Sequence, residues 1–470
     1  MTPSPGDAIG AGAVVPLAAP APRPTGRPAL PAPGRPGSEW SWSADGIEEV
    51  PTTAGGAVPA ELTDRFGRGV RDLRLSVTDR CNLRCTYCMP EAGPGWLPTA
   101  SLLDAREIAR LARIAVERLG VERIRLTGGE PLMRRDLEEI VAAVASLRTR
   151  RTGAKPDIGL TTNGLGLDRR AAGLRTAGLD RVNVSIDTLD AGEYAAITRR
   201  DRLDGVLRGV VGAQEAGLGP IKINAVAMPG SMGRRAPRLL AECLRRGWQL
   251  RFIEHMPLGP RESWRAEDVV GAARILAELG EAGFALREVG RSDRRPASLW
   301  HVAAGAADGV GEYPAGSVGI IASVTAPFCA DCDRTRITAD GRLMTCLFSA
   351  RETDLRGPMR AGASDDELIR IWAAATWRKP FAHGLDAPDP ALGDFVRPAR
   401  TITMSAGNSV NTAATTLVSG GFVKTSPACA TTGAKLLAHA SASNAPAASA
   451  NVGTPKFRWL SHAAANKIAR

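Results

Sequence analysis

Short apolar runs alternate with amphipathic segments between residues 73 and 253 of this 470-residue chain. Apolar runs of this length, bounded by turn residues, predict the buried strands of a parallel sheet. The predicted strands are Leu73–Val77, Arg123–Thr127, Asp157–Thr161, Arg181–Ile186, Ile221–Val226 and Leu250–Ile253. Six strand–helix units predict an α/β fold with right-handed crossovers. Because a full barrel needs eight units, we expect a partial (βα)6 barrel.

The segments between these strands show the spacing of amphipathic helices. In the first of them the apolar positions are Ile108, Leu111, Ala112, Ala115 and Leu119. Gly120 then provides a natural helix end. After the second strand, Asp136 is placed to cap a helix and Glu139 to complete a capping box. Parallel sheets bind ligands at the carboxyl ends of their strands, so we expect the functional residues there.

Changes in composition and periodicity divide the chain into four parts. Residues 1–62 are rich in Pro, Gly and Ala, which predicts a disordered extension. Residues 63–290 contain the predicted barrel, and residues 291–400, where the periodicity weakens, predict a smaller C-terminal domain that caps it. Residues 401–470 form an atypical tail, also expected to be disordered, which contains no Asp or Glu from residue 408 onward.

The net charge of +11 suits anionic partners such as nucleotide phosphates or nucleic acid. Aromatic residues make up only 4% of the chain and do not alternate with basic ones, which disfavours nucleic-acid binding. No apolar stretch is long enough to span a bilayer, and the first residues lack the pattern of a signal peptide. The cysteine spacing is typical of metal sites in a reducing compartment. We therefore expect a cytoplasmic protein without membrane contact.

Six of the eight cysteines fall into two triads. The first triad is Cys81, Cys85 and Cys88 (C-x3-C-x2-C), and the second is Cys329, Cys332 and Cys346 (C-x2-C-x13-C). Three thiolates hold three irons of a [4Fe–4S] cube and leave the fourth iron open, whereas an electron-transfer cluster uses four cysteines. The alternative of a zinc site at the first triad lacks a fourth Cys or His nearby. Cys243 is predicted to be a core thiol, and Cys429 lies in the tail.

The first triad together with Tyr87 resembles the signature of radical S-adenosylmethionine (SAM) enzymes. Its flanks, from Asp72 to Met89-Pro90, resemble those of the GTP 3′,8-cyclases of molybdenum cofactor biosynthesis, and the resemblance covers about residues 64–400. It implies two [4Fe–4S] clusters, one on each triad, with SAM as cofactor and GTP as substrate. The implied reaction converts GTP to (8S)-3′,8-cyclo-7,8-dihydroguanosine 5′-triphosphate, the first step of molybdopterin biosynthesis. In this reaction a 5′-deoxyadenosyl radical removes hydrogen from C3′ of the ribose.

The same resemblance assigns roles to individual residues. The catalytic ones are Cys81, Cys85, Cys88, Arg334 and Arg336. Those expected to bind SAM are Tyr87, Gly129, Ser185 and Met256, and those expected to bind GTP are Arg74, Arg125, Thr161, Lys222, Arg334, Thr335 and Arg336. A triphosphate needs several forked donors in one cavity, which suits arginines on neighbouring strands. Without the resemblance, Gly129 would be a turn residue, Lys222 an edge residue and Met256 core packing.

The resemblance further implies an electron donor such as flavodoxin or ferredoxin, and transfer of the product to cyclic pyranopterin monophosphate synthase. It also admits a homodimer. The chain departs from the family pattern after Met404, where an expected Gly-Gly ending is missing; Gly420-Gly421 is internal. An altered reading frame or a terminal fusion would explain this tail. His255 replaces a usual aromatic residue, and residues 231–233 replace a usual Asn-Asp turn.

Three alternatives stay open at this point. The first is a degenerate homologue that binds clusters and SAM but cyclises GTP poorly because the Gly-Gly ending is missing. The second is a radical SAM enzyme that modifies peptides, although such enzymes tend to carry more cysteines in the C-terminal region. The third is a non-catalytic iron–sulfur or zinc protein.

Overall fold

The computed structural model describes residues 58–383, except residues 231, 234, 260–262, 292–293 and 350. Residues 1–57 of the extension predicted to be disordered (residues 1–62), the tail with Cys429 and the altered C-terminal ending all lie outside the described residues. None of the helices in the described part combines the length and apolar character that a membrane span requires.

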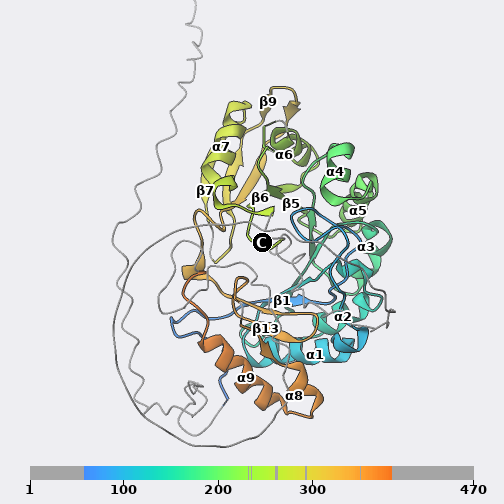
Figure 1. Cartoon of the computed structure of the whole chain (residues 1–470), viewed down its shortest axis with the longest axis vertical. Helices are drawn as coiled ribbons and strands as arrows, with labels where there is room; N and C mark the ends of the chain where they lie inside the picture. The colour runs from blue at the N-terminus through green and yellow to red at the C-terminus, as the bar shows by residue number, and fades with distance from the viewer. Residues whose placement is uncertain are drawn as a thin grey trace, which may run out of the picture.

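Six parallel strands form the centre of a curved sheet, in the order of the sequence (Figure 1). They are β1 (Asp72–Ser76), β2 (Arg123–Thr127), β3 (Asp157–Thr162), β4 (Arg181–Ser185), β5 (Lys222–Ala227) and β6 (Gln249–Glu254). Each observed strand overlaps its predicted range, which confirms the partial barrel. Helices cover its outer face: α1 (Ala105–Arg113), α2 (Leu137–Ala145), α3 (Leu167–Thr176), α4 (Ala191–Thr198), α5 (Leu203–Glu215) and α6 (Arg235–Arg245).

The strands separate an apolar core from a polar interior. Leu73 and Leu75 of β1 belong to the apolar core formed with the helices. Arg74 lies between them and therefore projects from the opposite face, because side chains alternate along a strand. The predicted core thiol Cys243, in α6, is buried in the same apolar core. The polar faces of the strands thus surround the inside of the barrel, where a ligand can bind.

The C-terminal region adds strands to both edges of this sheet. Strand β12 (Arg334–Ile337) pairs in parallel with β1, and β11 (Gly316–Ile321) pairs in parallel with β6. The other elements are α7 (Ala272–Glu281), β7 (Leu286–Gly290), β8 (Ser298–Val302), β9 (Gly305–Ala307), β10 (Gly311–Tyr313), β13 (Arg342–Met344), β14 (Thr353–Asp354), α8 (Arg356–Arg360) and α9 (Asp365–Trp377). Residues 322–333 must therefore cross from the β6 edge to the β1 edge, and this crossing carries two cysteines of the second triad.

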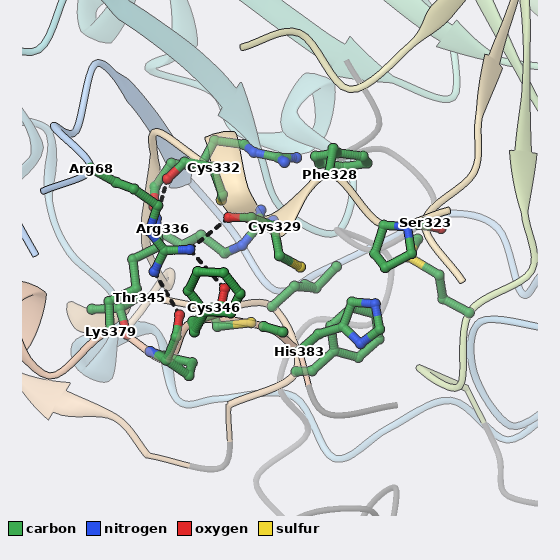
Figure 2. Close-up of a pocket in the computed structure, with 18 of the residues that line it drawn as sticks. Arg68, Ser323, Phe328, Cys329, Cys332, Arg336, Thr345, Cys346, Lys379 and His383 are labelled. Carbon is green, nitrogen blue, oxygen red and sulfur yellow. Dashed lines mark hydrogen bonds between the residues drawn. The ribbon is translucent and has the colours of Figure 1, made fainter. Parts of the chain in front are cut away.

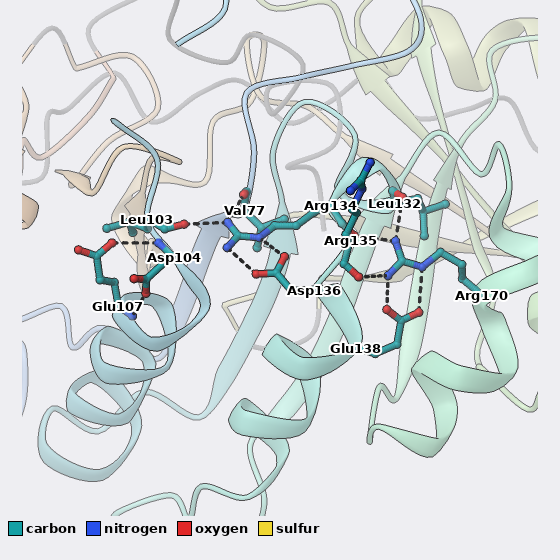
Figure 3. Close-up of polar contacts among 10 residues, drawn as sticks. All are labelled: Val77, Leu103, Asp104, Glu107, Leu132, Arg134, Arg135, Asp136, Glu138 and Arg170. Atoms are coloured by element: carbon teal, nitrogen blue, oxygen red, sulfur yellow. Dashed lines mark hydrogen bonds and ion pairs between the residues drawn. The ribbon is translucent and has the colours of Figure 1, made fainter. Parts of the chain in front are cut away.

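The predicted capping box of α2 is wrong. Asp136 occupies the N-cap position, but its carboxylate accepts no hydrogen bond from the first turn of the helix. It accepts one from Arg134 Nε at 2.7 Å instead, and Arg134 also donates to the main-chain oxygens of Val77 and Leu103 (Figure 3). A charged partner two residues away competes successfully for the carboxylate, because hydrogen bonds between ions are the stronger ones.

Candidate active site

The first triad lies in the loop that follows β1. Cys81 and Cys88 are buried and Cys85 is half-buried, in a small apolar cluster that includes Val226 of β5. Asn163, at the end of β3, directs its Nδ2 toward Cys81 Sγ at 4.0 Å. The three thiols thus face a mostly apolar environment at the carboxyl ends of the strands, as the sequence predicts.

The loop after β2 packs directly on this cysteine loop. A Cβ atom on Gly129 would lie 2.1 Å from the carbonyl oxygen of Arg80, so only glycine fits. Gly128 has a φ of +145°, and a Cβ atom added to it would likewise collide with the main chain of Thr78. The carboxylate of Glu130 accepts hydrogen bonds from Thr162 Oγ1 at 2.6 Å and from the main-chain nitrogen of Asn163 at 2.7 Å. The predicted SAM residue Gly129 therefore lies beside the triad, with its backbone held in place.

Tyr87 connects the first triad to strands β4 and β6. Its hydroxyl donates to Asp187 Oδ2 at 2.6 Å, and its ring meets the ring of His255 edge-on at 6.2 Å. Burial, and next the charge of Asp187, raise the pKa of Tyr87. Burial lowers the pKa of His255 to about 4, so its imidazole is neutral near pH 7. Met256 follows His255 at the end of β6. His255 therefore contacts the loop of the first triad, whereas Met256 lines the neighbouring cavity.

The second triad lines a cavity of about 680 Å³, including its mouth (Figure 2). Cys329 lies in the short helix η6 (Cys329–Asp331), Cys332 follows it, and Cys346 follows β13. The same cavity is lined by Met256 of the β6 end and by Arg334 and Arg336 of β12. The structure therefore brings the second triad, both expected catalytic arginines and one expected SAM residue into a single space.

The thiols of the second triad experience different electrostatic environments. Burial raises the pKa of Cys332, but the charges of Arg334 and Lys379 outweigh it and lower that pKa to about 6. Burial, and then the neighbouring Cys346, raise the pKa of Cys329 to about 11. Burial also raises the pKa of Cys346. A thiolate is the form that binds metal, so the cations beside Cys332 favour the binding state of that residue.

Each triad supplies three thiols, which is the donor set of a [4Fe–4S] cube with one open iron. Within the described residues, no three Cys, His, Asp or Glu side chains converge closely enough to hold one metal ion. In a cube each thiolate binds a separate iron, so the sulfurs need not converge on one point.

The arginines of β1 and β12 lie side by side. The register pairs Asp72 with Arg334 and Arg74 with Arg336. Arg74 Nε donates to Asp72 Oδ1 at 2.9 Å. Burial, followed by the charges of Arg334 and Arg74, lowers the pKa of Arg336 to about 9. Asp72 offsets part of this buried positive charge, and an anionic ligand would offset more of it.

The remaining predicted residues follow the same inward face around the barrel. Arg125 pairs with Gly159, whose missing side chain makes room for it: a Cβ there would lie 2.0 Å from Arg125 Nη1. Thr161 pairs with Asn183, which in turn pairs with Lys222. The hydroxyls of Thr161 and of Ser185 in β4 are buried and have no hydrogen-bond partner among the described residues. These orphaned groups fit a polar ligand inside the barrel.

Thr335 differs from the other predicted residues. It pairs with Leu73, so its side chain lies on the face opposite to that of the arginines on either side of it. Its hydroxyl is buried and has no partner among the described residues. Only the main chain of Thr335 is therefore placed to contact a ligand inside the barrel.

Comparison with known proteins agrees with this geometry. The model of the Radical SAM superfamily matches residues 75–240, and that of Molybdenum Cofactor Synthesis C matches residues 248–385. A GTP 3′,8-cyclase of Corynebacterium glutamicum is 54% identical over 346 residues, which cover 74% of this chain and 89% of that protein. The chain belongs to the GTP 3′,8-cyclase family. A family member of Mycobacterium marinum is 52% identical over 347 residues, covering 74% of this chain and 92% of that protein.

Among solved structures, Streptococcus suis SuiB bound to its precursor peptide SuiA superimposes with a TM-score of 0.47 at 15% sequence identity. The match covers 70% of this chain and 67% of that one. As a member of the radical SAM superfamily, the chain carries the motif for one [4Fe–4S] cluster and for SAM.

Three residues that the structure of this cyclase-family chain places at the site were not predicted from the sequence. Arg251 of β6 pairs with Asn224 on the inward face and is buried. The alternation of inward and outward side chains along β6 would have predicted its position. Arg68 and Lys379 line the cavity of the second triad. Both donate hydrogen bonds to main-chain carbonyl oxygens, and no sequence motif indicates such contacts.

Proposed function

We propose that this chain is a GTP 3′,8-cyclase, which converts GTP to (8S)-3′,8-cyclo-7,8-dihydroguanosine 5′-triphosphate. One observation carries the proposal: the second triad, Arg334, Arg336 and Met256 line one cavity, and His255 beside Met256 touches the loop of the first triad. A substrate in this cavity would lie between two cluster sites and beside a row of buried cations. The relatives at 52–54% identity carry the same activity in their names.

The residues around the first triad would hold the cluster and SAM. Cys81, Cys85 and Cys88 would supply three thiolates, and Gly129, packed closely on the cysteine loop, would let SAM approach the main chain without a side chain in the way. The buried hydroxyl of Ser185 offers a hydrogen bond to SAM. Cluster and SAM together supply a 5′-deoxyadenosyl radical that can remove hydrogen from C3′ of the ribose. The buried walls then exclude water, which protects a reactive species from side reactions.

The cations of the inward face would bind the triphosphate of GTP. Arg74 of β1, Arg125 of β2 and Lys222 of β5 would approach it from the barrel, and Arg334 and Arg336 would approach it from β12. Forked guanidinium groups bind phosphate oxygens in pairs, which fixes the orientation of the nucleotide as well as its charge. Correct placement is essential because a misplaced radical attacks whatever group is nearest. Thr161 would add a hydroxyl contact, and Thr335 a main-chain contact.

The second triad would hold a second [4Fe–4S] cluster with an open iron for the guanine base. The same proposal includes the barrel at residues 63–290 and the cluster-binding domain at residues 291–400. An external donor such as flavodoxin or ferredoxin would supply the electron, and cyclic pyranopterin monophosphate synthase would consume the product. A cytoplasmic location and a homodimer are compatible with this scheme.

Anaerobic product analysis tests the proposal. Full-length protein, reconstituted with iron and sulfide, is incubated with SAM, GTP and dithionite, and the products are separated by liquid chromatography with mass detection. We expect 5′-deoxyadenosine together with a cyclised guanosine nucleotide, and neither from a Cys85→Ala variant. Formation of 5′-deoxyadenosine without any cyclised nucleotide would contradict the proposal and favour the degenerate homologue.

A further inference from the structure

Two buried cations hold the main chain of the C-x2-C pair in the second triad. Arg68 Nη1 donates to the carbonyl oxygen of Cys329 at 2.6 Å, and Lys379 Nζ donates to that of Cys332 at 2.7 Å. Arg68 is 8% exposed and Lys379 only 2%. Figure 2 shows both side chains beside the cysteines, on the wall of the cavity. Each cysteine of the pair therefore has a cation bound directly to its own peptide group.

Arg68 joins three segments that are far apart in the sequence. Its Nε forms an ion pair with Asp64 at 2.6 Å, in the segment that precedes β1. In the segment after α9, Nη2 donates to the main-chain oxygen of Pro380 at 2.6 Å, and Nη1 donates also to that of Phe381 at 2.8 Å. The guanidinium thus fixes the cysteine loop to both ends of the described chain.

Lys379 is different because its ammonium holds only carbonyl groups. Besides the oxygen of Cys332, it donates to the main-chain oxygen of Arg334 at 2.8 Å. Among the described residues it forms no ion pair with a carboxylate, unlike Arg68. Taking an ammonium out of water is expensive without a compensating charge. An electron-rich cluster on the neighbouring thiolates would provide that compensation.

We propose that Arg68 and Lys379 are positioning residues of the second iron–sulfur cluster, which fix its C-x2-C loop and favour its reduced state. The inference rests on the second cluster of the proposed function. One-electron reduction adds a negative charge to the cluster, and a cation nearby stabilises that charge more strongly than it stabilises the oxidised form. A clamp that served folding alone would leave the reduction potential unchanged.

The test isolates the second cluster in the full chain. A parent variant with Cys81, Cys85 and Cys88 replaced by alanine is reconstituted anaerobically, and its cluster is titrated with dithionite while the reduced signal is followed by electron paramagnetic resonance. We expect Lys379→Met to shift the reduction equilibrium toward the oxidised form by about tenfold. For a one-electron couple this lowers the midpoint potential by about 59 mV. Lys379→Arg, which keeps the charge, should restore most of the potential.

Two control variants match the two cations. Lys155 also donates to a main-chain oxygen, that of Gly178 at 2.8 Å, but it lies on the surface before β3 and, unlike Lys379, also pairs with a carboxylate, that of Asp180. Arg170 pairs with Glu138 and donates to the carbonyl oxygens of a loop after β2, as Figure 3 shows, so it resembles Arg68 in its pattern of contacts, although it is less buried. Lys155→Met and Arg170→Met should leave the potential of the second cluster unchanged, whereas Arg68→Met should lower it.

Each outcome decides the inference. A midpoint potential in Lys379→Met and Arg68→Met equal to that of the parent overturns it while leaving the two-cluster proposal intact. If Lys379→Met loses iron but keeps its circular dichroism spectrum, recovery of the iron in Lys379→Arg supports the positioning role. If the parent itself binds no iron, the second cluster of the proposed function fails, and this inference fails with it.

Discussion

Replacing Gly159 by alanine is expected to displace the buried Arg125 guanidinium without altering any charged group. The new Cβ would lie 2.0 Å from Nη1 and 2.3 Å from Cζ of Arg125, far inside contact distance. Arg125 is 2% exposed, and the atoms that the new Cβ would meet are the end of its side chain, so the guanidinium must move within the barrel interior. Gly159 and Arg125 are directly paired on β3 and β2, which leaves the strands little freedom to separate.

The size of the effect follows from two contributions. Overpacking of a buried site costs about 1–3 kcal/mol of folding free energy. Under the proposed function, a displaced guanidinium would also lose charged hydrogen bonds to GTP, each worth about 1.5–3 kcal/mol. We therefore expect the affinity for GTP to fall roughly 10- to 150-fold, since each 1.4 kcal/mol is about tenfold. The affinity for SAM should change little, because the residues proposed to bind SAM lie at the carboxyl ends of the strands.

A double-mutant cycle with calorimetric GTP binding and urea unfolding measures both contributions. In the Arg125→Ala background, Gly159→Ala should have almost no further effect, because the group with which the methyl collides is absent. Gly280→Ala in α7, where a Cβ meets nothing within 4 Å, is the matched control. Equal losses with and without the Arg125 side chain would refute this account of Gly159.

Three further predictions follow from the same structure. Tyr87→Phe removes the 2.6 Å hydrogen bond to buried Asp187 and should lower the free energy of unfolding by about 1–3 kcal/mol, whereas Tyr313→Phe, which loses only a 3.5 Å contact with Gly283, should have little effect in the same urea titration. Asp136→Asn should destabilise the protein at neutral pH, because Arg134 holds the pKa of Asp136 below its ordinary value of 3.8. The stabilisation by this ion pair is present above pH 3.8 and is lost as the pH falls through the lowered pKa of Asp136. A difference in unfolding free energy between wild type and variant that stays constant in acid would argue against the ion pair. Replacing Cys329, Cys332 and Cys346 by alanine should reduce the iron content from about eight to about four per chain, and an unchanged content would exclude the second cluster.

The strands and the cysteine loops were predictable because their signals are local. The apolar runs of β1 to β6 and the spacing of each triad are both visible within a few residues of sequence. The attachment of β11 and β12 to opposite edges of the sheet was not predictable in this way. It depends on pairing between strands about 70 and 260 positions apart, as in Ile253 with Ile321 and Asp72 with Arg334.

The contacts that shape the site depend on atoms that leave little trace in the sequence. Gly159 acts through a missing side chain, and Arg68 and Lys379 act on carbonyl groups that every residue possesses. Asp136 shows the opposite case, in which a local signal for a cap was present but a stronger charged partner was closer. The chemistry of the site residues could therefore be predicted from motifs. The residues that position them could be identified only in the tertiary structure.

The most direct test of the central claim is the fate of the hydrogen at C3′ of GTP. GTP carrying deuterium at C3′ is incubated anaerobically with the reconstituted full-length protein, SAM and dithionite, and the 5′-deoxyadenosine is analysed by mass spectrometry. Our account predicts that one deuterium moves from C3′ to the 5′-deoxyadenosine as the cyclised nucleotide forms. Unlabelled 5′-deoxyadenosine, with the deuterium retained in GTP, would contradict it.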